Sequence, residues 1–262
     1  MRSRNVGTKL IKTALEDSNT NVSRQLIRNR LHSQGLYRRI KRKVPMISKV
    51  NQKKRFLYAK EYRNHPNSYW NNVMYVDEKK FELVRNPRRQ YIWRRKNSAY
   101  EDGNTEAYAK SESVMVWGAF GANGVGGIVV IPSTMNGAMY CDILKKYLVS
   151  SAKKIGLKRG WKLLQDNDPK HTSKIVKSKL SRMKIKCINH PTQSPDMNPI
   201  ENLWDYVDRK ICATDRSSKK SMSNAIISEW NNIPKEACQK LATSMPKRVS
   251  ELFDLKGRAT HY

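Results

Sequence analysis

The sequence has few acidic residues, and this scarcity is its first informative feature. Only 22 Asp and Glu stand against 52 Lys and Arg in 262 residues, so the formal net charge is +30 at pH 7. So large a basic excess points to a polyanionic partner, either nucleic acid or an anionic surface. No stretch approaches the roughly 18 to 20 apolar residues that a membrane-spanning helix needs, so we expect no membrane partner. The first five residues also lack the apolar segment of a signal peptide.

Close groups of metal-binding side chains are lacking as well. The four cysteines lie at least 25 positions apart, and the five histidines are equally scattered. This spacing gives neither a zinc cluster nor a disulfide framework, and it suits a reducing compartment. Any bound metal would have to be held by carboxylates, which favours hard ions such as Mg²⁺ or Mn²⁺.

Half of the formal charge lies in the first 60 residues, which hold 17 basic residues and two acids. Apolar residues at helical spacing predict two short helices there, at about 8–16 and 22–33. A polar turn at 17–21 separates them, and Gly35 is expected to end the second. The residues expected to face inward are Leu10, Ile11 and Ala14 in the first helix, and Val22, Leu26, Ile27 and Leu31 in the second.

A helix, a short turn and a basic helix form a helix-turn-helix pattern, so we expect 1–48 to be a small all-α DNA-binding domain with a basic linker. The alternative is a solvated amphipathic hairpin. The basic run at 38–43 suits a grip on the DNA backbone, a nuclear localisation signal or a solvated charge run. The expected DNA contacts are Ser23, Arg24, Arg28, Arg30, Arg38, Arg39, Lys41, Arg42 and Lys43.

Apolar strands begin at residue 72, after an expected connecting helix within 49–71. Three strands, then helix, strand, helix, strand and helix, describe a mixed α/β sheet with helices on its faces over 72–262. A basic and aromatic segment at about 84–112 breaks this order as an insertion, and we expect it to contact nucleic acid or a partner subunit. The expected strands are 72–77, 113–120, 125–131, 161–166 and 185–190, and the expected helices are 137–153, 170–182, 199–212, 219–231 and 234–253.

Three acids stand in local contexts that suit one phosphoryl-transfer site. Asp77 and Asp166 each end an expected strand, and Glu201 opens an expected helix, with 34 residues between Asp166 and Glu201. Strand ends and helix starts converge at one edge of an α/β sheet. Phosphodiester chemistry needs carboxylates that hold two metal ions about 4 Å apart. On so basic a chain, these acids favour an enzyme that acts on DNA.

Simpler explanations exist for Asp77 and Glu201. A charge after four apolar residues is costly without a partner, and for Asp77 that partner is either a metal ion or Lys79 or Lys80. Glu201 also suits the third position of a helix capped by Asn198. The remaining acids of this helix that share its face, and so compete for a metal, are Asp205 and Asp208.

The segment after Asp166 has its own structural explanation. Asp168 precedes Pro169, and this order predicts a helix N-cap with proline at the first helical position. Asp168 is therefore assigned to capping and Asp166 to the metal. His171 is expected on the surface of the first helical turn, and we assign it no role.

Four segments resemble the signature blocks of the Tc/mariner transposases. They are Tyr75 to Glu78, Ser113 to Gly118, Gln165 to Ser173 and Ser194 to Trp204. The similarity runs in order from about residue 20 to residue 246. It implies an RNase H-like catalytic core with Asp77, Asp166 and Glu201 as the metal-binding catalytic acids. It also implies two Mg²⁺ or Mn²⁺ ions at the site.

The same resemblance implies a reaction and its partners. Metal-activated water would cleave at the transposon ends, and the freed 3′-hydroxyl would then attack a target, typically a TA dinucleotide. The expected partners are double-stranded DNA, from terminal repeats and target, and a second copy of the chain, with the nucleus as location. The insertion at 84–112 resembles the loop through which relatives contact that second copy.

Full-length relatives begin with two helix-turn-helix units joined by a Gly-Arg-Pro-Arg hook, and this chain resembles only the second unit. We therefore expect general DNA affinity through phosphate contacts. A truncated or repurposed DNA-binding remnant without cleavage activity is the alternative function. A host-type nuclease of RNase H-like fold would share the acids but not the four blocks.

Overall fold

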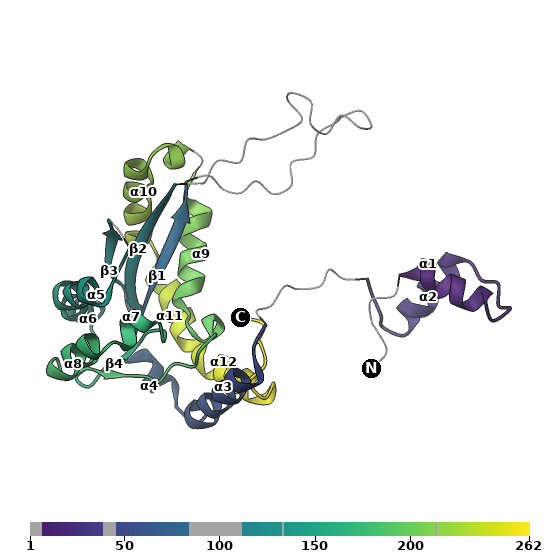
Figure 1. The fold of residues 1–262 in the computed structure, drawn as a ribbon, viewed down its shortest axis with the longest axis horizontal. Coiled ribbons are helices and arrows are strands. Elements are labelled where there is room, and N and C mark those ends of the chain that lie inside the picture. Colours follow the sequence, from purple (N-terminus) through teal and green to yellow (C-terminus); the bar gives the residue numbers. More distant parts are fainter. Residues whose placement is uncertain (1–6, 39–45, 84–111, 133, 213) are drawn as a thin grey trace. The chain divides into compact units, whose positions relative to one another are not determined.

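The computed structural model describes residues 7–38, 46–83, 112–132, 134–212 and 214–262 (Figure 1). The chain divides into two compact units, Met1–Val44 and Pro45–Tyr262. Within the described ranges, no helix has both the length and the apolar character that crossing a membrane requires. The expected insertion at 84–112 lies outside the described residues except for its last position.

The smaller unit contains two helices at the predicted positions. α1 spans Thr8–Glu16 and α2 spans Arg24–Ser33. The Ser23 hydroxyl accepts a hydrogen bond from the Leu26 amide at 3.1 Å, which satisfies an otherwise unpaired donor at the start of α2. Gly35 follows α2 in the left-handed conformation (φ 69°), which confirms the expected helix stop.

The inward faces of α1 and α2 differ in part from the prediction. Ile27 is buried and Ile11 is half-buried, as expected. Leu10 and Leu26 are 63% and 54% exposed, and Ala14 is exposed as well, so the prediction that these three face inward is wrong. Two short helices contact each other along one narrow stripe, which leaves part of a wider apolar stripe uncovered.

The larger unit is organised around a mixed five-stranded sheet in the order β3-β2-β1-β4-β5. The strands are β1 (Val73–Glu82), β2 (Ser113–Gly121), β3 (Gly124–Ile131), β4 (Lys162–Leu164) and β5 (Lys186–Cys187). β2 pairs antiparallel with β1 and β3, whereas β4 pairs parallel with β1 and β5. All five predicted strands exist. β1 continues past its expected end at 77 because β2 pairs with it as far as Glu82.

Helices cover both faces of this sheet (Figure 1). Three of the predicted helices are interrupted, at the π-helical segment η1, at Ser173 and at Ser244. The helical segments are α3 (Lys49–Tyr62), α4 (Asn67–Asn71), α5 (Gly137–Ile143), η1 (Leu144–Leu148), α6 (Val149–Ile155), α7 (Pro169–Thr172), α8 (Lys174–Arg182), η2 (Pro195–Met197), α9 (Ile200–Lys210), η3 (Thr214–Ser217), α10 (Lys219–Asn231), α11 (Lys235–Thr243) and α12 (Met245–Asp254).

Alternation along β1 directs neighbouring side chains to opposite faces of the sheet. Tyr75 belongs to a core formed with α3 and α9 to α12, whereas Val76 belongs to a second core formed with α5, α6 and α8. Because both faces are covered, the first four residues of β1 are all buried. The same alternation sends Asp77 and Glu78 to different sides.

A buried arginine joins α3 to the segment that precedes α9. The Arg55 guanidinium, fully buried, donates two hydrogen bonds to the Asp196 carboxylate at 2.7 and 2.6 Å. Arg248 of α12 donates to the Asp196 carbonyl at 2.8 Å and to Asn202 Oδ1 at 2.7 Å. Charge-assisted pairs of this kind are stronger than neutral hydrogen bonds, so these two arginines fix the position of α9.

Candidate active site

The strand register places two acids at the same level of the sheet. β1 and β4 pair in parallel from Val73 opposite Lys162 to Tyr75 opposite Leu164. Two residues further on, β1 carries Asp77, and the chain beyond the end of β4 carries Asp166. The prediction that Asp77 ends its strand is wrong, since β1 continues along β2. The end of β4 instead leaves one side of β1 open beside Asp77.

Asp77 lies in a negative and partly desolvated environment. Its Oδ2 accepts a hydrogen bond from the indole Nε1 of Trp204 at 3.3 Å. Burial, followed by the nearby charges of Glu201 and Glu78, raises the pKa of Asp77 well above its ordinary value. Lys79 pairs with Glu201 instead, its Nζ 3.5 Å from Oε2, so the expected pairing of Asp77 with a neighbouring lysine is not found.

A glycine makes room for the indole that holds Asp77. Gly118 of β2 stands opposite Asp77 in the antiparallel register. A Cβ at this position would lie 2.5 Å from the ring of Trp204, closer than such atoms approach. Trp204 stacks on Trp230 at a centroid distance of 4.6 Å, so the indole has little freedom to move away. The absence of a side chain at Gly118 therefore positions Trp204.

Glu201 lies in the first turn of α9, as predicted, but its helix is capped differently. Pro199 occupies the N-cap position without a side-chain cap, so the expected cap by Asn198 is wrong. The Asn198 side chain is buried, and its Oδ1 has no hydrogen-bond partner among the described residues. Of the two possible competitors, Asp208 pairs with Arg216 at 2.6 Å. Asp205 is exposed and does not line the cleft described below.

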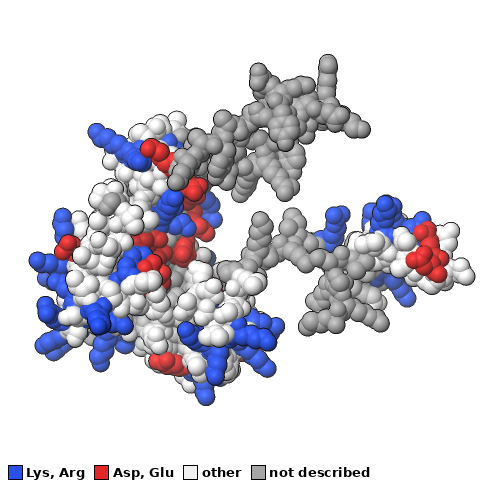
Figure 2. All heavy atoms as spheres, in the orientation of Figure 1, with Lys and Arg blue, Asp and Glu red and all other residues white. Residues whose placement is uncertain are grey.

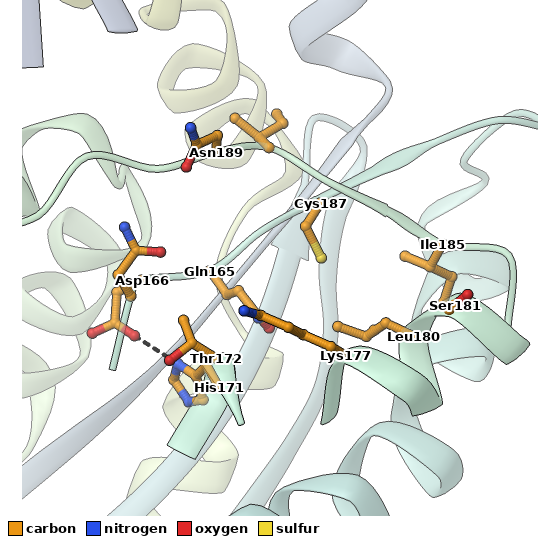
Figure 3. Close-up of a pocket in the computed structure, with 12 residues that line it drawn as sticks. Gln165, Asp166, His171, Thr172, Lys177, Leu180, Ser181, Ile185, Cys187 and Asn189 are labelled. Carbon is orange, nitrogen blue, oxygen red and sulfur yellow. Dashed lines mark hydrogen bonds and ion pairs between the residues drawn. The ribbon is translucent and has the colours of Figure 1, made fainter. Parts of the chain in front are cut away.

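His171 is a functional neighbour that sequence reasoning missed. We expect it on the surface, but it is buried, with Nδ1 2.6 Å from Asp166 Oδ1 (Figure 3). Its Nε2 lies 3.2 Å from Glu78 Oε1. Burial alone would lower the pKa of His171. The bonds to these two carboxylates outweigh burial, so the pKa of His171 is raised to about 9. The imidazolium therefore bridges both acids at neutral pH, and it lowers the pKa of Asp166 although burial opposes this.

The helix turn at α7 explains this contact. The Asp168 carboxylate accepts a hydrogen bond from the Lys170 amide at 2.9 Å, and Pro169 occupies the first helical position, which confirms the predicted cap. One turn of helix then carries His171 back over Asp166. The Asp168-Pro169 cap was the signal in the sequence that the chain turns into a helix directly after Asp166.

The three predicted acids line one cleft of about 310 Å³, together with the buried Asn198 and His190. Among the described residues, no three acids already form a cluster that could hold a metal ion. Each acid instead has a protein partner: Trp204, His171 or Lys79. The cleft nevertheless fits a hard cation, because the neighbouring carboxylates help to raise the pKa of Asp77 and the Asn198 oxygen has no partner among the described residues.

The predicted DNA contacts lie in the smaller unit. Arg24, Arg28, Arg30 and Arg38 are exposed, and Ser23 is the N-cap of α2. The other four, Arg39, Lys41, Arg42 and Lys43, lie outside the described residues. The structure therefore leaves the arginines of α2 accessible to a nucleic acid.

The central strand β1, the end of the neighbouring strand β4 and the covering helix α9 each bring one acid to the cleft. A mixed sheet with this arrangement is typical of an RNase H-like nuclease. Residues 72–223 match the family described as DDE superfamily endonuclease, and residues 2–64 match a family described as transposase. The chain belongs to the Tc1/mariner family of cut-and-paste DNA transposases, which are DDE endonucleases and strand transferases.

Curated relatives and solved structures agree with this assignment. The chain is 35% identical over 242 residues to the Tcb1 transposase of Caenorhabditis briggsae, covering 92% of this chain and 88% of the relative. It is 34% identical over 243 residues to the Tc1 transposase of Caenorhabditis elegans, with the same coverage. The fold resembles the Mos1 transposase in a paired-end complex, with a TM-score of 0.75 at 18% identity, covering 98% of this chain and 81% of that one.

Proposed function

We propose that the cleft is the catalytic centre for cleavage at transposon ends and for strand transfer into target DNA, typically at TA. Asp77, Asp166 and Glu201 are the acids that hold the metal. The observation that carries this proposal is the register of β1 and β4, which sets Asp166 level with Asp77 on the open side of β1. The start of α9 adds Glu201 to the same cleft. No observation favours the alternative of a DNA-binding remnant without cleavage.

We propose Mg²⁺ as the working ion, two per site, with Mn²⁺ able to replace it. Divalent metal use follows from the family, and Mos1 paired-end complexes have been solved with Mg and with Mn. When bound, such ions activate the attacking oxygen and stabilise the leaving one. The carboxylate and amide oxygens of the cleft are the donors that these ions prefer.

The residues around the acids have positioning roles in this proposal. Trp204 orients Asp77 through its indole donor, and His171 orients Asp166 through Nδ1. Lys79 lies next to Glu201 and lowers the local negative charge before a cation enters. Each acid is thus held close to the cleft by a side-chain contact that a metal ion would compete with.

The chain binds DNA, and we propose that it does so as a homodimer on two transposon ends in the nucleus. The Mos1 paired-end complexes support the dimer, and the basic run at 38–43 supports the location. Ser23, the four accessible arginines and the remaining cations of the run are proposed to contact the phosphates of the terminal repeats.

The decisive experiment is cleavage of a plasmid that carries the element's own ends, in the presence of Mg²⁺. Wild type should cut at the ends, whereas Glu201→Ala should bind the plasmid without cutting it. Asp205→Ala is the matched control, because it removes an exposed acid of the same helix that lies outside the cleft. Binding without cleavage by wild type would support the remnant, and cleavage by Glu201→Ala would remove that residue from the site.

A second experiment tests the DNA contacts of α2. Replacing Arg24, Arg28 and Arg30 together by alanine should weaken DNA binding and flatten its salt dependence by about 0.9 per lost phosphate contact. Asp166→Ala is the comparison, because it removes a carboxylate and no phosphate contact. An unchanged salt slope would mean that α2 does not contact DNA.

A further inference from the structure

Between Asp166 and Glu201, the 27 residues that separate Asp168 from Asp196 contain no acid. It carries seven basic residues, six of them between 174 and 186, on α8 and the segment that ends in β5. Figure 2 shows Lys and Arg atoms gathered on the side of the larger unit where Figure 1 places α8. This part of the surface is therefore cationic by composition and by position.

The six cations between 174 and 186 also lack counter-ions within the part of the chain that the structure describes. Among the described residues, none of the six between 174 and 186 forms an ion pair, although Lys170, just before them, contacts both Glu78 and Asp168. Like charges held together without partners repel one another and contribute nothing to the fold. Such an arrangement suits a surface whose counter-charge arrives with a ligand.

A groove runs from the active site along this surface. It measures about 440 Å³ and lies between α8 and the chain around β5. Asp166 and Asn167 line both this groove and the catalytic cleft, so the two hollows share a wall. Figure 3 shows Lys177 reaching from α8 into the groove and Cys187 pointing into it from β5. Asp166 is the only acid among the lining residues.

We propose that this groove, here called the α8 groove, holds the sugar-phosphate backbone of the DNA that continues past the reacting phosphate. Successive phosphates of one strand advance by about 3.4 Å along the duplex axis, so a strand with one phosphate at the acids can bring its next ones to the shared wall. Lys177 and its exposed neighbour Lys174, one helical turn away, supply the phosphate contacts. The proposal rests on the proposed function, because it takes the acidic cleft as the reaction centre.

The first test removes the two lysines. Lys174→Ala combined with Lys177→Ala should weaken DNA binding several-fold and reduce the salt slope by about 1.8, or about 0.9 per phosphate contact. The matched control is Lys235→Ala combined with Lys240→Ala, which removes two exposed lysines of α11 on the opposite face of the sheet. Equal effects of the two double variants on affinity and slope would overturn the proposal.

The second test uses the cysteines of the full-length chain as reporters. Cys187 and Cys212 are both exposed, but only Cys187 lines the α8 groove. DNA added in EDTA should slow maleimide labelling of Cys187 at least fivefold relative to Cys212, as measured by peptide mass spectrometry. The Lys174 and Lys177 double variant should lose this protection. Labelling of Cys187 that DNA leaves unchanged, or protection that survives in the double variant, would overturn the proposal.

Two DNA sources are separated by the choice of duplex. If the DNA that flanks the element occupies the α8 groove, an element end with its flank should protect Cys187 and the same end without its flank should not. A TA-containing duplex added to pre-cut ends tests the target. Plasmid cleavage is scored in parallel: cleavage with no protection by any duplex refutes the α8 groove alone. Protection without cleavage would support the groove and contradict the proposed function.

Discussion

Asp77 and Glu78 are neighbours on β1, yet they lie on opposite faces of the sheet and in opposite electrostatic surroundings. Asp77 accepts a hydrogen bond from a neutral indole and is surrounded by other carboxylates. Glu78 lies 3.2 Å from Lys170 Nζ and 3.2 Å from His171 Nε2, both of them cationic at neutral pH. One carboxylate is left short of positive charge, and the other is fully paired.

The difference separates an acid whose surroundings suit a metal ion from one whose partners stabilise the fold. A paired carboxylate stabilises the fold and has no need of a further cation. An acid that has only a neutral hydrogen-bond donor and lies among other carboxylates destabilises the site without metal. Binding of a metal ion would stabilise its charged form. Alternation by one residue along a single strand is enough to produce both situations.

The largest expected effect comes from Asp77→Asn, which removes the unpaired acid and keeps its shape. Cleavage should fall by about a thousandfold or more, because metal stabilisation of charge is worth several kcal/mol and each 1.36 kcal/mol is a factor of ten. The free energy of unfolding should stay the same or rise, since a carboxylate with a raised pKa costs stability at neutral pH. Cleavage assays and urea unfolding measure the two quantities, and a clear loss of stability would contradict the contrast.

Asp196 extends the comparison to a carboxylate paired with a fully buried arginine. Asp196→Ala should lower the free energy of unfolding by about 3–5 kcal/mol, because it leaves the Arg55 guanidinium buried without its partner. Denaturant unfolding of this variant beside Asp205→Ala, which removes an exposed acid, makes the measurement. Equal stability of the two variants would mean that the pair does not hold α3 to the segment before α9.

Gly118→Ala tests the packing that orients Asp77. The added methyl would meet the Trp204 ring at 2.5 Å, and overpacking of this kind costs about 1–3 kcal/mol. The displaced indole should also raise the Mg²⁺ concentration needed for cleavage. Gly7→Ala, where a Cβ meets nothing within 4 Å and φ is −74°, controls for the change from glycine to alanine without this contact. Unchanged metal dependence in Gly118→Ala would argue against Trp204 as a positioning residue.

Glu78→Gln weakens the paired side of β1. The amide oxygen can still accept a hydrogen bond, so we expect a loss of only about 1 kcal/mol in the free energy of unfolding. Cleavage should decrease far less than in Asp77→Asn, because Glu78 acts on Asp166 through His171. A loss of cleavage as complete as that of Asp77→Asn would place Glu78 among the metal ligands.

The smallest effect is a dependence of stability on pH. Burial alone would raise the pKa of Asp196. The bonds from Arg55 and Thr260 outweigh burial, so the pKa of Asp196 lies below its ordinary value. The stabilisation by Asp196 is therefore complete above pH 4 and is lost as the pH falls through the lowered pKa. Acid unfolding should show a smaller pH slope in Asp196→Asn than in wild type, and equal slopes would contradict this assignment.

The sequence predicted the strands and most helices because these depend on local patterns. Apolar runs indicated the strands, and Asp168 before Pro169 indicated a helix start. The burial of His171 could not be predicted in this way. It depends on Glu78, 93 positions away in the chain, and a cationic side chain is buried only where such partners meet it.

The extent of β1 was missed for a related reason. The sequence turns polar at the end of the apolar run, with Asp77, Glu78, Lys79 and Lys80. The hydrophobic pattern therefore predicts that the strand ends at 77. Pairing with β2 continues regardless, because Phe81 returns to the core and main-chain hydrogen bonds do not depend on side-chain polarity. Tertiary pairing therefore decided where the strand ends.

The short β4 strand has a consequence for how such enzymes change over time. β4 ends at Leu164, and Asp166 follows two residues later. Adding two residues to this segment would move the acid by about 7 Å along the sheet, since a strand rises about 3.3 Å per residue. On the proposed function, insertions and deletions here would inactivate a copy while leaving Asp77, Asp166 and Glu201 in place. An inactive copy of this gene can therefore keep all three acids, and the number of residues between Trp161 and Asp166 is as informative as their identity.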